Sequence, residues 1–222
     1  ISDHDQYRRG QRSVRALYGD DIALCAGDLL LTAAFQTAAR ISEPAVAQRL
    51  TGFMADTAAR VIGGQSVELA ASGRAHDIRV VDYLAATREK TAPLIELALN
   101  VGISNSTEAP YPAALGRRIA EAIGLAYQIL DDLDDLQTID DPGRLHSLHA
   151  WWQHQPHPAA GDSRREEARQ RCLTHARAAL NRADSLSAHL PKPLADNVRQ
   201  LIQRLSRQSR VISDRALTRQ KG

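Results

Sequence analysis

The sequence predicts an all-α fold, built as an antiparallel bundle of helices. Almost every long segment repeats its apolar residues at the spacing of a helix, and no segment keeps the period-two alternation of a strand. The chain has 222 residues, of which 43% are hydrophobic, so it can bury one sizeable core. No internal repeat or linker divides it. We therefore expect a single domain over residues 1–222.

The first two expected helices cover residues 20–40 and 43–71. The first is rich in Ala and Leu and begins after Gly19 with two aspartates, which are favourable at a helix N-terminus. In the second, Pro44 occupies a typical first-turn position. The adjacent glycines Gly63–Gly64 are expected to interrupt this second helix, because glycine is a poor helix former.

Four more helices are expected over residues 77–101, 112–135, 163–190 and 193–213. Pro93 should kink the first of them or divide it in two, since proline removes a backbone donor and clashes with the preceding turn. The helix over 112–135 carries its apolar residues on one face, which should be core. That face comprises Ile119, Ile123, Ala126, Leu130 and Leu133.

Residues 139–162 read as a loop rich in His, Pro and Gly. Its aromatic and imidazole side chains are His146, His149, Trp151, Trp152, His154 and His157. The four histidines raise the question of a metal site, but no motif with zinc-ligand spacing, such as H-E-x-x-H, accompanies them. Zinc is therefore not expected here.

Charge and composition argue against nucleic acid and membrane partners. The formal net charge is +2, with no basic stripe interleaved with aromatics, so nucleic-acid binding is not expected. The continuous apolar stretches are shorter than a membrane span, and the N-terminus is polar, so neither a span nor a signal peptide is expected. Cys25 and Cys172 are isolated and should be small buried hydrophobes in a protein of the reducing cytoplasm. Because the first residue is Ile1 rather than Met, we interpret the sequence as a fragment.

The candidate chemistry is concentrated in three aspartates, Asp131, Asp132 and Asp135. On a helix, Asp131 and Asp135 lie about 40° apart around the axis and about 6 Å apart along it, with Asp132 beside them. Like charges at this spacing repel, and a hard divalent cation removes that cost. Carboxylate oxygens suit Mg²⁺, which keeps coordination sites open for phosphate oxygens. A solvated acidic helix end explains the cluster equally well, so on this evidence both interpretations stay open.

Two longer stretches carry a family resemblance. The run 124–135, GLAYQILDDLDD, resembles the second aspartate-rich motif of the trans-isoprenyl diphosphate synthases, GxxFQxxDDxxD, with Tyr127 in place of Phe. The run 3–10, DHDQYRRG, resembles the end of their first aspartate-rich motif, in which DDxxD is followed by RRG. In that alignment the first two aspartates of the motif precede Ile1.

Three shorter stretches follow the same family order. Residues 26–30 resemble the AGDxLL helix, Gly64-Gln65 with Glu68 resembles a GQxxD segment, and Lys90-Thr91 resembles the KT dipeptide. Lys90 is one of only three lysines in a chain with 25 arginines, which is a weak functional hint by itself. Five matches in order identify the chain as resembling this family from Asp3 to Asp135.

The resemblance implies a fold, an activity and partners. The fold is an isoprenoid synthase helical bundle with a central cavity, here without its N-terminal helices. The activity is Mg²⁺-dependent transfer of a prenyl group, in which an allylic diphosphate ionises and its carbocation is attacked by isopentenyl diphosphate. A homodimer and a short product such as farnesyl or geranylgeranyl diphosphate are also implied. The residues limiting product length often precede the first motif in this family, so the sequence does not give that length.

The resemblance also assigns roles to individual residues. The metal ligands would be Asp3, Asp131, Asp132 and Asp135. The diphosphate-binding residues would be Arg8, Arg9, Lys90, Thr91, Gln128 and Arg144, with Arg9 on isopentenyl diphosphate. The catalytic residues would be Lys90, Gln128 and Asp131. Arg144 follows Gly143 where the family usually has a GK dipeptide, and guanidinium and ammonium groups are not interchangeable.

Two other functions fit part of this pattern. The chain could be a non-catalytic or regulatory subunit of a prenyl diphosphate synthase, as its divergent segment after Asp140 suggests. It could also be a class I terpene cyclase, which ionises similar substrates. The second DDxxD motif and the Arg8-Arg9 pair favour the synthase, and a requirement for isopentenyl diphosphate in an assay separates the two enzymes.

Overall fold

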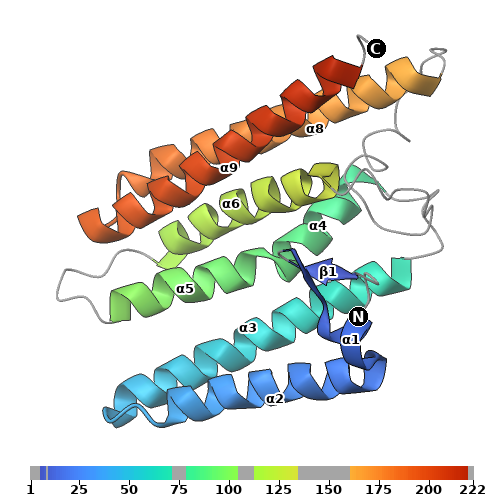
Figure 1. Ribbon diagram of the computed structural model, residues 1–222. Coiled ribbons are helices and arrows are strands. Elements are labelled where there is room, and N and C mark those ends of the chain that lie inside the picture. Colours follow the sequence, from blue (N-terminus) through green and yellow to red (C-terminus); the bar gives the residue numbers. More distant parts are fainter. Residues whose placement is uncertain (1–5, 9, 72–78, 105–112, 135–160, 220–222) are drawn as a thin grey trace. The chain divides into compact units, whose positions relative to one another are not determined.

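A computed structural model describes the chain mainly as helices (Figure 1). The residues it describes are 6–8, 10–71, 79–104, 113–134 and 161–219. Two compact units can be distinguished, Ile1–Ala55 and Asp56–Gly222. All described elements are helices apart from two strands of two residues each, so the predicted all-α fold is confirmed.

The first unit begins with a small hairpin that the sequence did not predict. Strand β1, Tyr7–Arg8, pairs antiparallel with strand β2, Gln11–Arg12. Gly10 between them has φ 78°, a left-handed conformation that glycine adopts without steric cost. Strands this short carry no alternation pattern, which is why sequence periodicity missed them.

Two helices follow in the same unit. Helix α1, Val14–Tyr18, is capped by Ser13, whose Oγ accepts a hydrogen bond from the Ala16 amide at 3.1 Å. Gly19, at φ 86°, ends α1, and helix α2, Asp20–Ala39, starts immediately after it. The boundaries predicted for α2, residues 20–40, therefore agree with the structure within one residue.

Helix α2 is rich in Ala and Leu, yet Ala38 is its only buried residue. By length and composition it is the one helix in the described part of the chain that could cross a membrane, with a mean hydropathy of 1.5 over its most apolar window. Helices of soluble cores and interfaces have the same composition. Cys25 lies on α2 and is exposed, so its predicted burial is wrong; α2 has almost no buried side to place it on.

Helix α3, Pro44–Ala71, is continuous through Gly63 and Gly64. The expected interruption there is wrong. Gly64 is buried against a neighbouring helix, and packing of this kind overrides a low helix propensity.

Proline divides the next segment, as predicted. Helix α4, Val80–Lys90, ends at Thr91, whose amide donates to the Thr87 carbonyl at 3.1 Å. Helix α5, Ala92–Ser104, begins one residue later, with Pro93 in its first turn, where a missing amide hydrogen costs nothing.

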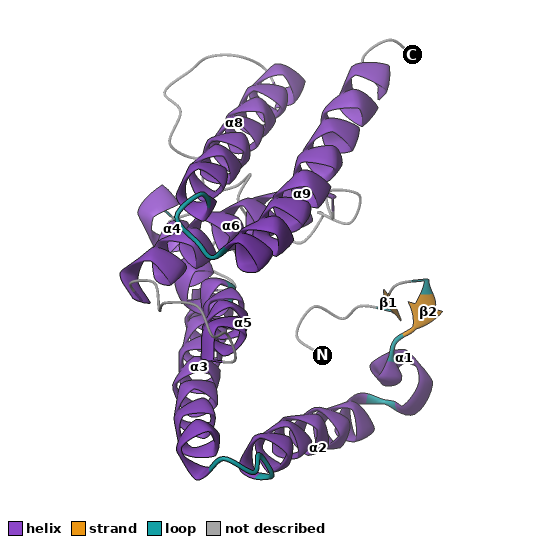
Figure 2. Cartoon of the chain, turned by 90° about the vertical axis from the view of Figure 1, so that its left-hand side faces the viewer, coloured by secondary structure: helices purple, strands orange, loops and turns teal. Residues whose placement is uncertain are grey.

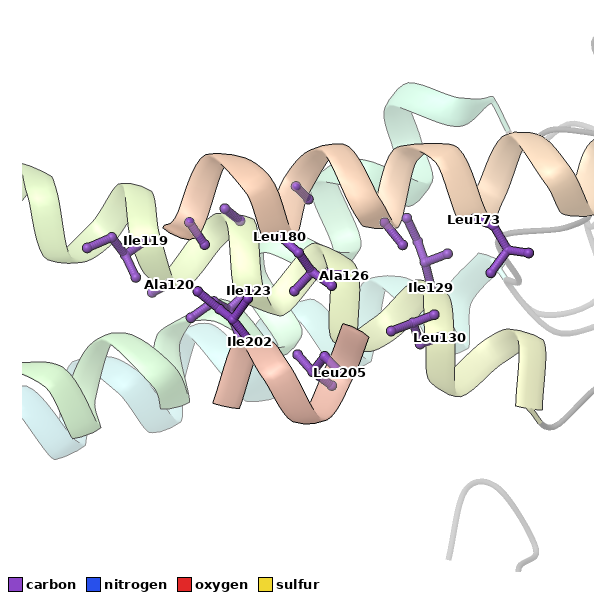
Figure 3. Packing of buried hydrophobic residues seen from close by; sticks show 14 of the residues in the cluster. Ile119, Ala120, Ile123, Ala126, Ile129, Leu130, Leu173, Leu180, Ile202 and Leu205 are labelled. Carbon is purple, nitrogen blue, oxygen red and sulfur yellow. The ribbon is translucent and has the colours of Figure 1, made fainter. Parts of the chain in front are cut away.

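The core of the second unit lies along helix α6, Ala113–Asp134, which packs against α4, α5, α8 and α9. Helices α8, Gly161–Ser187, and α9, Lys192–Arg219, run side by side over it in both views (Figures 1 and 2). The cluster that they bury includes Ile119, Ile123, Ala126, Ile129, Leu130, Leu173, Leu180, Ile202 and Leu205 (Figure 3). Cys172 is fully buried in the same cluster, as predicted.

Predicted and observed boundaries agree within one residue for α6 and within three for α8, whereas α9 continues six residues past its predicted end at residue 213. The His- and Trp-containing segment lies outside the described residues up to position 160, and α8 already begins at Gly161.

Candidate active site

A chain of buried hydrogen bonds lies at the C-terminal end of α6. Gln128 and Asp132 are one helical turn apart and both are buried, Asp132 with 3% of its surface exposed. Four-residue spacing places their side chains on one face of the helix. The Gln128 Nε2 group donates to Asp132 Oδ1 at 2.9 Å. The helix face on which the sequence places the candidate site is therefore buried at Gln128 and Asp132, and a hydrogen bond orders these two side chains.

Two residues outside α6 extend this chain. The Tyr83 hydroxyl, from α4, donates to Asp132 Oδ2 at 2.9 Å. At the α4–α5 junction, the Thr91 hydroxyl donates to Gln128 Oε1 at 3.2 Å. Because an ionised carboxylate only accepts hydrogen bonds, the Gln128 amide nitrogen must face Asp132 and its oxygen must face Thr91. Gln128 is therefore held in one orientation by partners on both sides.

Tyr83 is the member of this chain that sequence reasoning missed. Its side chain is 2% exposed, and the pKa of its phenol is raised well above the ordinary value, first by burial and then by the negative charge of Asp132. The phenol consequently stays protonated and remains a donor. No sequence signal connects two residues 49 positions apart, and a tyrosine in a helix reads as ordinary core.

The other described aspartates at this helix end have different environments. Asp131 is half-buried and Asp134 is exposed, while Asp132 is turned into the core. Asp135, the remaining member of the predicted cluster, lies outside the described residues. The single patch expected for Asp131, Asp132 and Asp135 therefore stays a prediction.

The donor atoms here fit a hard cation. They are carboxylate oxygens at a helix C-terminus, where unpaired carbonyls already make the potential negative and further anionic groups are unfavourable without a counter-charge. Within the described ranges, no group of three or more His, Cys, Asp or Glu side chains is assembled for metal binding. Two of the four predicted ligands, Asp3 and Asp135, fall outside those ranges.

Lys90 and Thr91 lie at the end of α4, and both are half-buried. Positive charge in the last turn, from Lys90 and Arg88, is favourable there because the helix dipole is negative at that end. The structure thus brings residues from two separate sequence motifs, Lys90-Thr91 and Gln128 with Asp132, to one place through the Thr91–Gln128 bond.

The remaining predicted residues cannot be placed with these. Arg8 lies on β1 in the first unit, where its backbone is described and its side chain is not. Asp3, Arg9 and Arg144 lie outside the described residues.

Sequence comparison finds matches over the first two thirds of the chain. The profile of the polyprenyl synthetase family matches residues 1–142. A short chain isoprenyl diphosphate synthase of Methanothermobacter thermautotrophicus is 30% identical over 136 residues, which cover 61% of this chain and 42% of that protein. A nonaprenyl diphosphate synthase of Mycobacterium tuberculosis is 33% identical over 146 residues, 65% of this chain and 42% of its own. The chain thus aligns with less than half the length of these relatives.

Comparison of structures extends the likeness to the rest of the chain. A geranylgeranyl pyrophosphate synthase of Lactobacillus brevis superposes with a TM-score of 0.73 at 24% identity, covering 93% of this chain and 72% of the other. A geranylgeranyl pyrophosphate synthetase of the archaeon Geoglobus acetivorans gives 0.73 at 21% identity, covering 92% and 73%. At this level of identity the match shows the fold, which includes α8 and α9 beyond the family profile.

Proposed function

Because the chain belongs to the polyprenyl synthetase family, we propose that it forms part of a prenyltransferase that joins an allylic diphosphate to isopentenyl diphosphate. The product is a linear isoprenoid diphosphate that is longer by one five-carbon unit. The names of the matched relatives, from short chain isoprenyl to nonaprenyl diphosphate synthase, support elongation as the reaction and leave the product length open.

The observation that carries the proposal is the hydrogen-bonded chain Thr91–Gln128–Asp132–Tyr83. Its first three members were selected by sequence motifs lying far apart along the chain. A chance resemblance in two unrelated helices gives no reason for these side chains to contact one another. Their contact therefore supports a common role.

The proposed roles follow from the charge that develops during reaction. When the C1–oxygen bond of the allylic substrate breaks, positive charge appears on the allyl group and additional negative charge on the departing diphosphate. Arg8 and Lys90 would offset that negative charge, with Thr91 and Gln128 as further contacts. Arg9 would bind isopentenyl diphosphate, and Arg144 would supply additional positive charge. Attack by the isopentenyl double bond and loss of a proton complete the product.

The same proposal assigns Mg²⁺ to the aspartates. Asp131, Asp132 and Asp135, together with Asp3, would hold it, because their oxygen donors match its preference. When bound, Mg²⁺ supplies Lewis-acid stabilisation of the diphosphate leaving group. Asp132, whose two oxygens already accept bonds from Tyr83 and Gln128, would also keep the helix end in position.

The test is the change Asp131→Asn in the full-length protein, with turnover measured for allylic diphosphates of graded length plus isopentenyl diphosphate and Mg²⁺. We expect turnover to fall about 100-fold or more, since the loss of one preorganised electrostatic group commonly costs that much.

Asp134→Asn is the matched control, because Asp134 is exposed at the same helix end and occupies an x position of the DDxxD motif. It should retain near-normal turnover. Equal turnover in the two variants would contradict the assignment of Asp131. A product formed without isopentenyl diphosphate would favour a terpene cyclase.

Assembly and location complete the proposal. We infer a homodimer from the exposed apolar surface of α2, where Leu29 is 69% and Leu30 is 71% exposed. Exposed apolar side chains of this size commonly mark an interaction surface, and we propose that a second copy of the chain covers them. Two free cysteines, Cys25 and Cys172, are consistent with the cytoplasm.

A further inference from the structure

Two glycines on different helices meet the backbone of the α4–α5 junction. A Cβ atom added at Gly64, on α3, would lie 2.8 Å from the Glu89 carbonyl carbon and 2.8 Å from the Lys90 nitrogen. A Cβ atom added at Gly124, on α6, would lie 3.1 Å from both the Cα and the nitrogen of Ala92. Gly64 on α3 thus lies against Glu89 and Lys90, and Gly124 on α6 lies against Ala92, at the two ends of the same four-residue stretch.

The contact at Gly64 leaves no room for a side chain, and the contact at Gly124 is tight enough that a neighbour would have to shift by a few tenths of an ångström. A real Cβ essentially never comes within 3.0 Å of another heavy atom, and here the atoms it would meet are backbone, which cannot rotate away. Glycine permits this close approach because it has no side chain. A methyl group at Gly64 must therefore displace the Glu89–Lys90 peptide or move α3 away from it.

Ion pairs also connect α3 and α6 to the helices on either side of the α4–α5 junction. Arg60, one turn before Gly64 on α3, donates to Glu89 Oε2 at 2.9 Å and to Glu96 Oε2 at 3.0 Å. Arg117, on α6, donates to Glu96 Oε1 at 3.3 Å. Helix α3 is therefore tied by charge to both α4 and α5, and α6 is tied to α5.

We propose that Gly64 and Gly124 form a two-sided clamp that sets the position of Lys90 and Thr91. The clamp rests on the proposed function, since its purpose is to place these two groups on the allylic diphosphate. In this role both glycines are positioning residues: neither touches substrate, and each acts through the backbone of the junction. The clamp gives a reason for glycine at both places, strongest at Gly64, where a Cβ would meet backbone atoms at 2.8 Å.

The test compares Gly64→Ala with Gly63→Ala in the full-length protein. Gly63 is the neighbouring residue on the same helix, and a Cβ there meets nothing within 4 Å. Both changes raise helix propensity equally, so they differ only in contact with the junction. Amide hydrogen exchange over residues 87–95 should be faster in Gly64→Ala and unchanged in Gly63→Ala.

Steady-state kinetics distinguish positioning from simple loss of stability. In Gly64→Ala the KM for the allylic diphosphate should rise and kcat/KM should fall about 10- to 100-fold, because a displacement of about 1 Å can cost that much. The KM for isopentenyl diphosphate should stay constant. Partial unfolding would instead lower the apparent kcat and leave both KM values unchanged, and that result would overturn the clamp.

Gly124→Ala provides a second variant if Gly64→Ala does not fold, since its contacts at 3.1 Å require a smaller shift. It should show the same selective rise in the allylic KM. In the double variant the two losses should not be independent, because both methyl groups displace the same short junction.

The wild-type assay separates the two proposals. If the wild-type protein makes no prenyl product, the proposed function fails, and the hydrogen-exchange comparison alone decides the clamp. If it makes product and the alanine variants at Gly63 and Gly64 behave alike in both measurements, the clamp is wrong and the function stands.

Discussion

The Tyr83 phenol and the Gln128 amide each donate a hydrogen bond to one oxygen of the buried Asp132 carboxylate. Removing the phenol by Tyr83→Phe leaves the shape of the core unchanged and takes away a donor to a buried charge. We expect this change to lower the free energy of unfolding by about 1–3 kcal/mol, the usual cost of leaving a buried polar group short of a partner. Urea denaturation at neutral pH measures it. Tyr18→Phe, at an exposed position, is the control and should have no effect.

The same variant tests the raised pKa of Tyr83. In the unfolded chain the phenol ionises near its ordinary pKa of about 10, whereas the folded protein keeps it neutral to higher pH. Its contribution to stability is therefore complete below about pH 10 and is lost as the pH rises toward the folded pKa. The gap in stability between wild type and Tyr83→Phe should narrow above pH 10, and a constant gap would contradict the raised pKa.

For single residues, the sequence predicted which side chains belong to the candidate site better than it predicted how deeply they are buried. The motifs pointed to Thr91, Gln128 and Asp132, and the structure joins them by hydrogen bonds. The turn of Asp132 into the core was not predictable, because helical spacing groups neighbouring side chains without giving their depth. The burial of Asp132 depends on contacts with other helices, such as the hydrogen bond from Tyr83 on α4. These contacts form only when the chain folds.

A substitution in helix α9 can test whether the part of the chain beyond the family profile shares the hydrophobic core around α6. Leu205, on α9, is buried in the cluster around α6 (Figure 3). We expect Leu205→Ala to lower the free energy of unfolding by about 2–5 kcal/mol through lost burial and the cavity it leaves.

Val211→Ala, at a 48% exposed position of the same helix, should change the free energy of unfolding by less than about 0.5 kcal/mol. Thermal or urea unfolding of the three proteins makes the comparison. If the two variants were equally stable, α9 would not share the core of α6.

Most helices could be predicted because their signals are local. Periodicity gave α2, α6, α8 and α9, and Pro93 gave the division between α4 and α5. The hairpin and α1 were missed because two- and five-residue elements are too short for a period to appear. The continuity of α3 was missed for the opposite reason: the pair Gly63–Gly64 looks like a helix breaker, and only the long-range contact of Gly64 explains its presence.

For the whole molecule, the exposed surface of α2 predicts an assembly. We expect the full-length protein to be a dimer, and the double change Leu29→Glu with Leu30→Glu to make it monomeric, because burying two carboxylates in an apolar interface is costly. Sedimentation velocity measures the mass of each form.

Val211→Glu adds a charge at another exposed apolar position, on α9, and should leave the dimer intact. A monomeric wild type, or a dimer that persists in the α2 variant, would show that α2 is covered by something other than a second copy.

The hydrogen bond between Tyr83 and Asp132 makes the pKa of the phenol sensitive to the charge at Asp132. Part of the raised pKa of Tyr83 comes from the charge on Asp132, so a cation bound to that carboxylate would lower the pKa of the phenol. Of the five tyrosines in the chain, Tyr83 is therefore the one whose pKa should change when a cation binds at the C-terminal end of α6.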